Sequence, residues 1–184
     1  MTEQETIYTM ALTRTPRVNT ATQHHLMEEL GSATAVFDHC RHIRDFYPDA
    51  SDKLAAALQE MEAQVPRAEE ELEFSQKHHI KCLCYHDTDY PSRLRECDDA
   101  PLLLYYKGNA DLNQTHVINM VGTRHCTEYG KDICRRFVDE LATLCPDVLV
   151  VSGLAYGIDI HSHRAALDNG LDTVGVLAHG LDQI

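Results

Sequence analysis

Short apolar segments alternate with segments of helical periodicity in the second half of the chain. Residues 116–121 and 148–151 are apolar runs with little polar alternation, which is typical of strands that are buried on both faces. Residues 127–145 between them have the spacing of an amphipathic helix, so the pattern predicts a βαβ unit in a parallel sheet. A helix over residues 159–168 and a strand over residues 173–177 are expected to extend this sheet.

The helix expected over residues 127–145 carries a prominent apolar row. Thr127 precedes it and is the expected N-cap, because a threonine hydroxyl can accept a hydrogen bond from the backbone of the first turn. The apolar side chains recur at helical spacing and are expected to face the sheet; they are Ile133, Phe137, Leu141 and Leu144, with Val138 beside them.

The first part of the chain has helical patterning instead. Its expected helix boundaries are small polar residues, glycine and proline, namely Thr20 or Thr22, Gly31, Ser32, Ser51 and Pro66. The composition changes near Lys77, and strands are expected over residues 80–85 and 101–106. We therefore predict an α/β protein in which an all-helical domain, residues 1–75, precedes a Rossmann-like parallel sheet, residues 76–184.

Composition and charge narrow the possible functions. The chain has 184 residues, a formal net charge of −13 and seven cysteines. The negative charge argues against a surface that is basic throughout, although it leaves room for a small cationic site. No apolar run has the length of a membrane span, and the N-terminus does not have the pattern of a signal peptide. We expect a cytoplasmic protein with reduced thiols and no membrane partner.

The first candidate site is the turn after the first parallel strand. Gly122 permits close approach of a ligand to the backbone, Thr123 offers a hydroxyl, and Arg124 can hold a phosphate through two hydrogen bonds. A turn between a strand and a helix can direct backbone N–H groups at an anion. The spacing differs from G-x-G-x-x-G, which disfavours a dinucleotide cofactor. The alternative is an ordinary turn with a solvent-exposed arginine.

The second candidate site is the turn that follows the next strand. Ser152 stands at the strand end, but Val150 occupies the first glycine position of the G-x-S-x-G nucleophile motif, and no acid–base partner can be assigned. Binding of a phosphate or nucleotide is therefore preferred to catalysis. Asp159 is interpreted as a cap of the following helix and a structural residue of the turn, rather than as a base.

Two short motifs raise the question of a metal site. Cys82 and Cys84 alternate on an expected strand, with His86 nearby, but no second ligand pair stands at a zinc-site spacing. Buried thiols are the preferred interpretation. His161 and His163 are interpreted as structural or hydrogen-bonding groups. We expect neither a metal nor another cofactor.

The motifs of residues 80–184, taken in order, closely resemble the DNA-processing protein A (DprA/Smf) family. The matching stretches include V-G-T-R at residues 121–124, V-S-G-L-A-Y-G-I-D at residues 151–159 and G-L-D at residues 180–182. The segment with Tyr90-Pro91 and residues 101–108 resembles the entry to that family's core domain. Residues 1–75 are similar in kind to the sterile-alpha-motif or helix-hairpin-helix module that often precedes it.

The resemblance implies an extended Rossmann fold that binds single-stranded DNA without sequence specificity. It implies protection of incoming strands during DNA uptake in natural transformation, loading of the RecA recombinase, homodimers and no enzymatic activity. The implied phosphate-binding turn is Gly122, Thr123 and Arg124. Residues of the second turn are implied to line the adjacent pocket and shape its wall; they are Ser152, Gly153, Ala155, Tyr156 and Gly157, with Asp159 as the structural residue.

Two features of this sequence differ from the family pattern. Tyr156 stands where the family more often has arginine, which exchanges a cation for a ring that can stack on a base. The family also continues with further strands that supply basic residues and much of the dimer surface. We therefore expect a Rossmann-like core that is incomplete at the C-terminus, and a homodimer in the full-length family rather than in this chain.

An enzyme that cleaves a nucleotide is the main alternative function. LOG-type phosphoribohydrolases hold a nucleoside monophosphate in similar glycine-rich turns, and their chemistry needs a carboxylate. Their P-G-G-x-G-T-x-x-E motif is absent from this sequence. A helical interaction module with a degenerate core is a third interpretation. DNA binding is preferred because it uses the whole ordered series of motifs.

Overall fold

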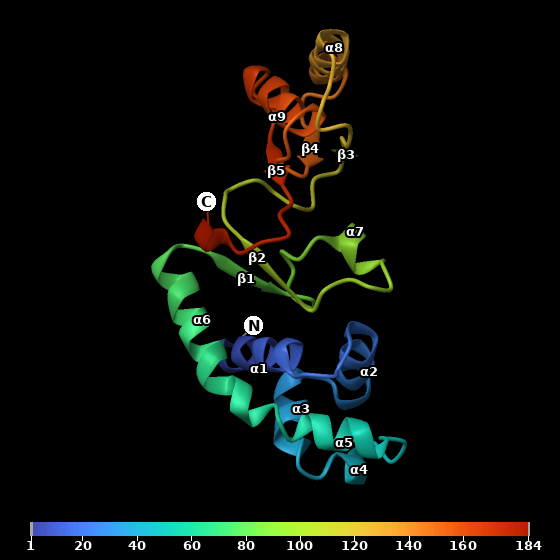
Figure 1. The fold of residues 1–184 in the computed structure, drawn as a ribbon, viewed down its shortest axis with the longest axis vertical. Coiled ribbons are helices and arrows are strands. Elements are labelled where there is room, and N and C mark those ends of the chain that lie inside the picture. Colours follow the sequence, from blue (N-terminus) through green and yellow to red (C-terminus); the bar gives the residue numbers. More distant parts are fainter. Residues whose placement is uncertain (1, 184) are drawn as a thin grey trace. The chain divides into compact units, whose positions relative to one another are not determined.

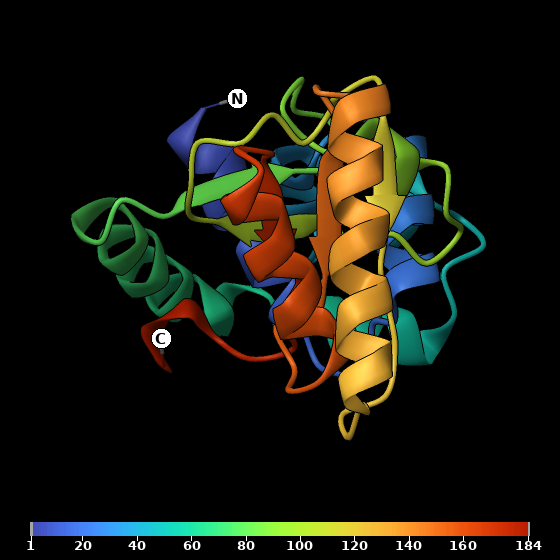
Figure 2. The same ribbon diagram turned by 90° about the horizontal axis from the view of Figure 1, so that it is seen from above.

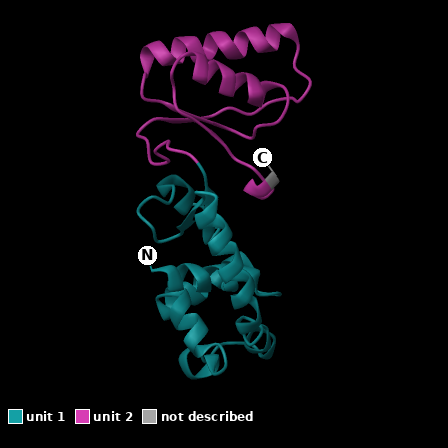
Figure 3. Cartoon of the chain, turned by 90° about the vertical axis from the view of Figure 1, so that its left-hand side faces the viewer, with its two compact units in different colours: residues 1–107 teal, residues 108–184 magenta. Residues whose placement is uncertain are grey.

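The computed structural model describes residues 2–183, which form two compact units (Figure 3). The first unit comprises residues 1–107 and the second comprises residues 108–184. Figures 1 and 2 show that the first contains most of the helices, whereas the second contains a parallel sheet and two long helices. No helix within residues 2–183 combines the length and apolar character that crossing a membrane requires.

The first unit is built mainly from short helices. They are α1 (Glu3–Arg14), α2 (Thr20–Leu30), α3 (Ala33–His39), α4 (Ile43–Phe46), α5 (Asp52–Leu58), η1 (Glu62–Gln64), α6 (Val65–Lys77) and α7 (Ser92–Arg95). Ser32 and Ser51 cap α3 and α5, as predicted, through hydrogen bonds from backbone N–H groups. The N-cap of α2 is Asn19 rather than a threonine, because its side-chain oxygen accepts from the Thr22 N–H at 2.9 Å.

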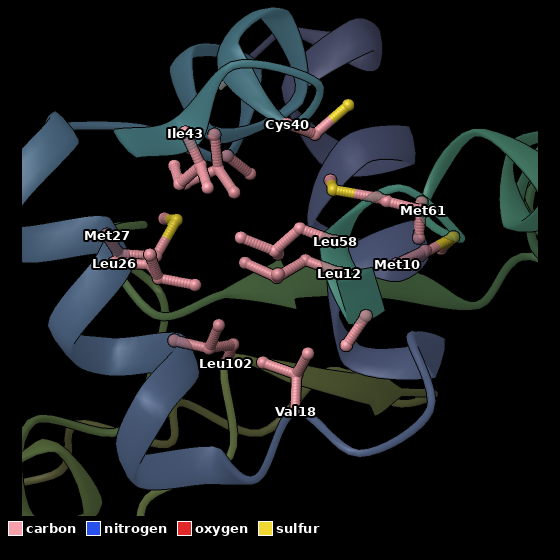
Figure 4. Close-up of a cluster of buried hydrophobic side chains, with 14 of the residues drawn as sticks. Met10, Leu12, Val18, Leu26, Met27, Cys40, Ile43, Leu58, Met61 and Leu102 are labelled. Atoms are coloured by element: carbon pink, nitrogen blue, oxygen red, sulfur yellow. The ribbon is translucent and has the colours of Figure 1, made fainter. Parts of the chain in front are cut away.

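A closed hydrophobic core lies between these helices (Figure 4). Its fully buried side chains include Leu12 from α1, Leu26 from α2 and Leu58 from α5. The Glu5 carboxylate adds a polar link, since it accepts hydrogen bonds from the Ala33 and Thr34 N–H groups at 2.7 and 3.0 Å. This carboxylate therefore joins α1 to the otherwise unpaired N-terminal amides of α3.

An antiparallel hairpin belongs to the first unit rather than to the second. Strands β1 (Lys81–Cys84) and β2 (Leu103–Tyr106) pair with Lys81 opposite Tyr106. Leu102 is part of the core between the helices, and Cys82 packs against it. The first unit consequently ends at Lys107, whereas the sequence placed the boundary after residue 75, where helical patterning ends. Packing of the hairpin on the helices gives the physical reason for this difference.

The second unit is a βαβαβ arrangement. Its elements are β3 (Val117–Asn119), α8 (Glu128–Leu144), β4 (Leu149–Ser152), α9 (Ile158–Asp168), β5 (Thr173–Gly175) and η2 (Leu181–Gln183). The strands are parallel in the order β3-β4-β5. Helices α8 and α9 lie side by side (Figure 2), and Val138 and Ala165 from them share one core with Val150 of β4. The predicted α/β fold class with a parallel sheet is confirmed.

Helix α8 has its predicted cap but not its predicted buried row. Thr127 accepts a hydrogen bond from the Gly130 N–H at 3.1 Å, as expected for the N-cap. Val138 is fully buried, but Ile133, Phe137 and Leu144 are 41%, 45% and 83% exposed. Apolar residues occupy two neighbouring rows of this helix. The row that starts at Cys134 faces the sheet and includes Val138 and Leu141, so the prediction is correct for Val138 and Leu141. It is wrong for Ile133, Phe137 and Leu144.

Of the two cysteines in the motif considered for zinc, Cys84 is buried, as expected, and Cys82 is half-buried against the core. All seven cysteines are unpaired. Cys84 is buried in the hairpin, and burial raises the pKa of its thiol to about 11. Such a thiol is protonated at neutral pH and behaves as an apolar side chain.

Candidate functional site

The two turns singled out in the sequence follow adjacent parallel strands, β3 and β4. Asn119 is opposite Val151 in the sheet, and the Met120 N–H donates to the Val151 carbonyl at 2.9 Å. Both strands therefore end at the same edge of the sheet. The carboxyl edge of an open α/β sheet is where ligands commonly bind, because the loops there are not needed for strand pairing.

The second turn passes so close to the first that only glycine fits at the crossing. Gly157 has φ of +88°, and a Cβ at this position would lie 2.0 Å from the Thr123 carbonyl oxygen. The Ile158 N–H donates to that same oxygen at 3.1 Å. A Cβ on Gly122 would lie 2.6 Å from the Ile158 side chain. The two turns thus hold each other in place.

The first turn leaves its hydrogen-bond donors available. Arg124 is exposed, and no residue within the described range forms an ion pair or hydrogen bond with its guanidinium. The backbone N–H groups of Gly122, Thr123 and Arg124 also have no acceptor among residues 2–183. The Thr123 hydroxyl accepts a hydrogen bond from the His125 N–H at 3.2 Å, which stabilises the turn. A cation beside free backbone N–H groups suits an anionic ligand.

The second turn contributes an exposed ring and further free backbone donors. The Tyr156 side chain is 86% exposed. The N–H groups of Gly153, Ala155 and Tyr156 have no acceptor in the described part of the chain. The Ala155 carbonyl, by contrast, accepts from the Ile160 N–H at 3.2 Å. The turn can therefore offer donors to a phosphate and a flat surface to a base.

Ser152 has a structural contact in this arrangement. Its side chain is buried, and its hydroxyl donates to the Met120 carbonyl at 2.6 Å. Its own carbonyl accepts from the Val176 N–H at 2.8 Å. Ser152 thus links all three strand ends. No described base contacts this hydroxyl, so the geometry does not form a nucleophile–base pair.

Asp159 lies within the first turn of α9 and is not its cap. The N-cap is Gly157, so the interpretation of Asp159 as a capping residue is wrong. Its carboxylate is buried, and a Cβ on Gly153 would lie 2.9 Å from its Oδ2 atom. Its Oδ1 atom has no partner within the described residues. The positive end of the helix dipole favours a carboxylate at this position.

His163, one helical turn after Asp159, is a hydrogen-bonding group, as predicted. Its Nδ1 atom lies 2.7 Å from the Thr173 hydroxyl, which donates to the Val150 carbonyl at 2.9 Å. Because that hydroxyl proton is already used, the imidazole Nδ1–H is the donor to Thr173. Burial lowers the pKa of His163 below its usual value, and the negative charge of the nearby Asp159 offsets only part of this shift. The neutral imidazole therefore fixes α9 on β5.

A hollow of about 310 Å³ between α8 and α9 was not anticipated and contains none of the predicted site residues. It is lined by Glu128, Lys131, Asp132, Arg135, His161, Arg164, Ala165 and Asp168. Lys131 and Arg135 pair with acids three residues earlier on α8. The hollow therefore presents acidic and basic side chains together, and its basic side chains on α8 are already paired.

Comparisons with known proteins relate this chain to one family. Residues 81–184 match the profile of the DNA recombination-mediator protein A family. The DNA processing protein DprA of Streptococcus pneumoniae is 43% identical over 96 residues, which are 52% of this chain and 33% of that protein. DprA of Bacillus subtilis is 33% identical over 133 residues, 72% of this chain and 44% of that protein.

The fold is also similar to a solved structure. The X-ray structure of DprA from Streptococcus pneumoniae matches with a TM-score of 0.71 and 30% sequence identity over 96% of this chain and 59% of that chain. This chain thus spans a third to less than half of the two curated relatives. The matched profile covers more than half of the chain and includes both glycine-rich turns. The chain therefore belongs to the DprA/Smf family of DNA recombination-mediator proteins.

Proposed function

We propose that this protein processes DNA during recombination by binding single strands without sequence specificity. In this proposal it acts in the cytoplasm, protects strands that enter during natural transformation and transfers them to a RecA-type recombinase. The chemistry is binding and transfer, with no bond made or broken. The names of the related DNA processing proteins support the general role.

The observation that carries the proposal is the crossing of the two turns at Gly157. The crossing fixes Arg124 beside the free N–H groups of the first turn, with the exposed Tyr156 in the second turn. A phosphate held by Arg124 and the backbone would leave the attached base able to stack on a ring. Base–aromatic stacking accepts any base and requires an unpaired strand, so both the lack of sequence preference and the preference for single strands follow.

The charge of the protein fits a local site. With a net charge of −13, the molecule as a whole repels the phosphate backbone. Binding then depends on a few contacts, and the salt dependence reports their number. Each phosphate contact on a single strand contributes about 0.7 to the slope of log affinity against log salt concentration.

Fluorescence anisotropy of a labelled oligo(dT) of about 30 nucleotides, a length that spans several single-strand sites, tests the proposal. We expect Arg124→Ala to weaken binding roughly 10- to 100-fold, as for loss of a charge-assisted hydrogen bond, and to lower the salt slope by about 0.7. Arg136→Ala is the matched control, because it removes the same charge from an exposed position on α8. Equal effects of the two substitutions would place binding elsewhere.

Tyr156 tests the stacking contact separately. We expect Tyr156→Ala to weaken binding by about 1–3 kcal/mol per stacked base, and Tyr156→Phe to retain it because the ring remains. Loss of binding in both variants would assign the contact to the hydroxyl. Duplex DNA of the same length should bind more weakly than oligo(dT), and recombinase filament assembly on a bound strand would test the transfer step.

A further inference from the structure

A second cluster of ligand-type side chains lies at the opposite end of β3 and β4 from the glycine-rich turns. His116 precedes β3, and Cys145 and Asp147 precede β4. One ligand atom from each, a ring nitrogen, a thiol sulfur and a carboxylate oxygen, all lie within 4.8 Å of one another. This cluster has no part in the proposed binding of DNA.

Backbone hydrogen bonds fix the positions of His116 and Cys145, and Asp147 lies two residues after Cys145. The Leu149 N–H donates to the His116 carbonyl at 2.9 Å, which continues the parallel pairing of β3 with β4. The Cys145 N–H donates to the Leu141 carbonyl of α8 at 2.7 Å, and the Cys145 carbonyl accepts from the Val148 N–H at 3.1 Å. The cluster therefore lies in the short segments that adjoin β3, α8 and β4, and backbone hydrogen bonds tie His116 and Cys145 to these elements.

His116 and Cys145 each contact Asp147 at a spacing suited to a metal ion. His116 Nδ1 lies 3.3 Å from both carboxylate oxygens of Asp147, and the Cys145 thiol lies 3.4 Å from Oδ1. Zinc bonds to these atom types are about 2.0–2.3 Å, so a tetrahedral ion separates its ligand atoms by about 3.3–3.6 Å.

We propose that His116, Cys145 and Asp147 bind a zinc ion. Sulfur, imidazole nitrogen and carboxylate oxygen together suit this borderline-soft cation better than magnesium or calcium, which prefer oxygen ligands alone. Three protein ligands leave a fourth position for water. Upon binding, the thiol proton passes to solvent and the sulfur bonds to the ion as thiolate. The ion ties the end of α8 to the starts of β3 and β4.

Titration of the reduced, chelator-treated chain with Zn²⁺ alone tests the proposal by calorimetry. We expect one ion per chain in the parent protein. We expect Cys145→Ser and Asp147→Asn each to weaken binding at least about tenfold, since even the loss of a supporting contact around a metal has an effect of that size. Absence of binding by the parent, or unchanged binding by both variants, would overturn the proposal.

Cobalt substitution identifies the sulfur ligand directly. A thiolate bound to Co²⁺ gives a charge-transfer absorption, which should disappear in Cys145→Ser and persist in Cys126→Ser, a matched control with another half-buried thiol in the same unit. Persistence in Cys145→Ser would assign the metal to other cysteines and contradict the proposal. Arg124→Ala should bind Zn²⁺ like the parent, so failure of the DNA proposal and failure of this one are distinguishable. Far-UV circular dichroism checks that each variant is folded.

Discussion

The two units use their apolar side chains differently. In the first unit, Leu12 and Leu26 are fully buried in a core that helices and a hairpin enclose (Figure 4). In the second unit, two helices cover a three-stranded sheet, and Phe137, Leu144 and Val176 remain exposed. A similar frequency of apolar residues thus accompanies a closed core in one unit and an open apolar surface in the other.

The polar groups show a corresponding difference. In the first unit the buried Gln23 amide donates to the Leu12 and Val18 carbonyls, and Glu5 pairs with the N-terminal amides of α3. In the second unit, buried atoms of Asp159 and His163 have no partner among the described residues. Buried polar atoms are normally paired, so these two atoms distinguish the second unit from the first. The second unit is also the one in which we propose that the chain binds DNA.

The largest difference between the units is expected for the same substitution at two leucines. Leu12→Ala removes a fully buried side chain of the first core, and we expect a loss of about 2–5 kcal/mol in unfolding free energy. Leu144→Ala should change it by no more than about 0.5 kcal/mol, because this side chain is 83% exposed. Urea denaturation followed by circular dichroism measures both values. Similar losses would mean that Leu144 is covered in solution and that the contrast between the units is false.

The crossing of the turns predicts a large effect within the second unit. Gly157→Ala would place a Cβ 2.0 Å from the Thr123 carbonyl oxygen, at positive φ. We expect a loss of about 2–4 kcal/mol from backbone strain and overpacking, together with loss of oligo(dT) binding.

Gly170→Ala is the control for positive φ alone. This glycine follows α9 with φ of +69°, and a Cβ there would meet no atom within 4 Å. Its substitution should cost about 1–2 kcal/mol and leave DNA binding unchanged. Thermal denaturation and oligo(dT) anisotropy of both variants distinguish the effect of the crowded crossing from the effect of positive φ alone. Equal losses of stability and binding in the two variants would show that the turns do not depend on each other.

The smallest expected effect concerns alkaline pH and a buried tyrosine of the first unit. Burial raises the pKa of Tyr90 to about 12, and its hydroxyl donates to the Pro101 carbonyl at 2.7 Å. The folded state therefore keeps the proton that the unfolded chain loses near pH 10. The stabilisation from this group is complete below about pH 10 and is lost as the pH rises through 12, with about 1.4 kcal/mol lost by about pH 11.

Tyr90→Phe should reduce this alkaline loss of stability, whereas Tyr156→Phe, at an 86% exposed position of the second unit, should retain it. Urea denaturation at about pH 8 and about pH 11, values on either side of the unfolded tyrosine pKa, measures the difference. If Tyr90→Phe lost as much stability at high pH as the parent, another group would be responsible.

Several local predictions were accurate because their signals lie within a few residues. The apolar runs placed β3 and β4, and Thr127, Ser32 and Ser51 cap the helices that they precede. The turn at Gly122 was found because a small residue and a cation follow an apolar run. In each case the deciding contact is between near neighbours in the chain.

Other predictions failed or were not possible because distant contacts decide them. Two adjacent apolar rows run along α8, and only packing against β4 and α9 selects the row that includes Val138. The boundary after residue 75 follows patterning, whereas the hairpin joins the first unit through Leu102. His116 and Asp147 are 31 residues apart, so no local motif indicates that they meet.

The sequence by itself determined the strand–turn–helix order of the second unit and the chemistry of its turns, since periodicity and turn residues act locally. Tertiary structure alone decided that Gly157 meets Thr123, that Ser152 bonds to the Met120 carbonyl, and that the exposed row of α8 remains uncovered in this unit. These outcomes depend on sheet register and helix packing. The contacts involved join atoms that are distant in sequence, and their free energy is not encoded in either segment alone.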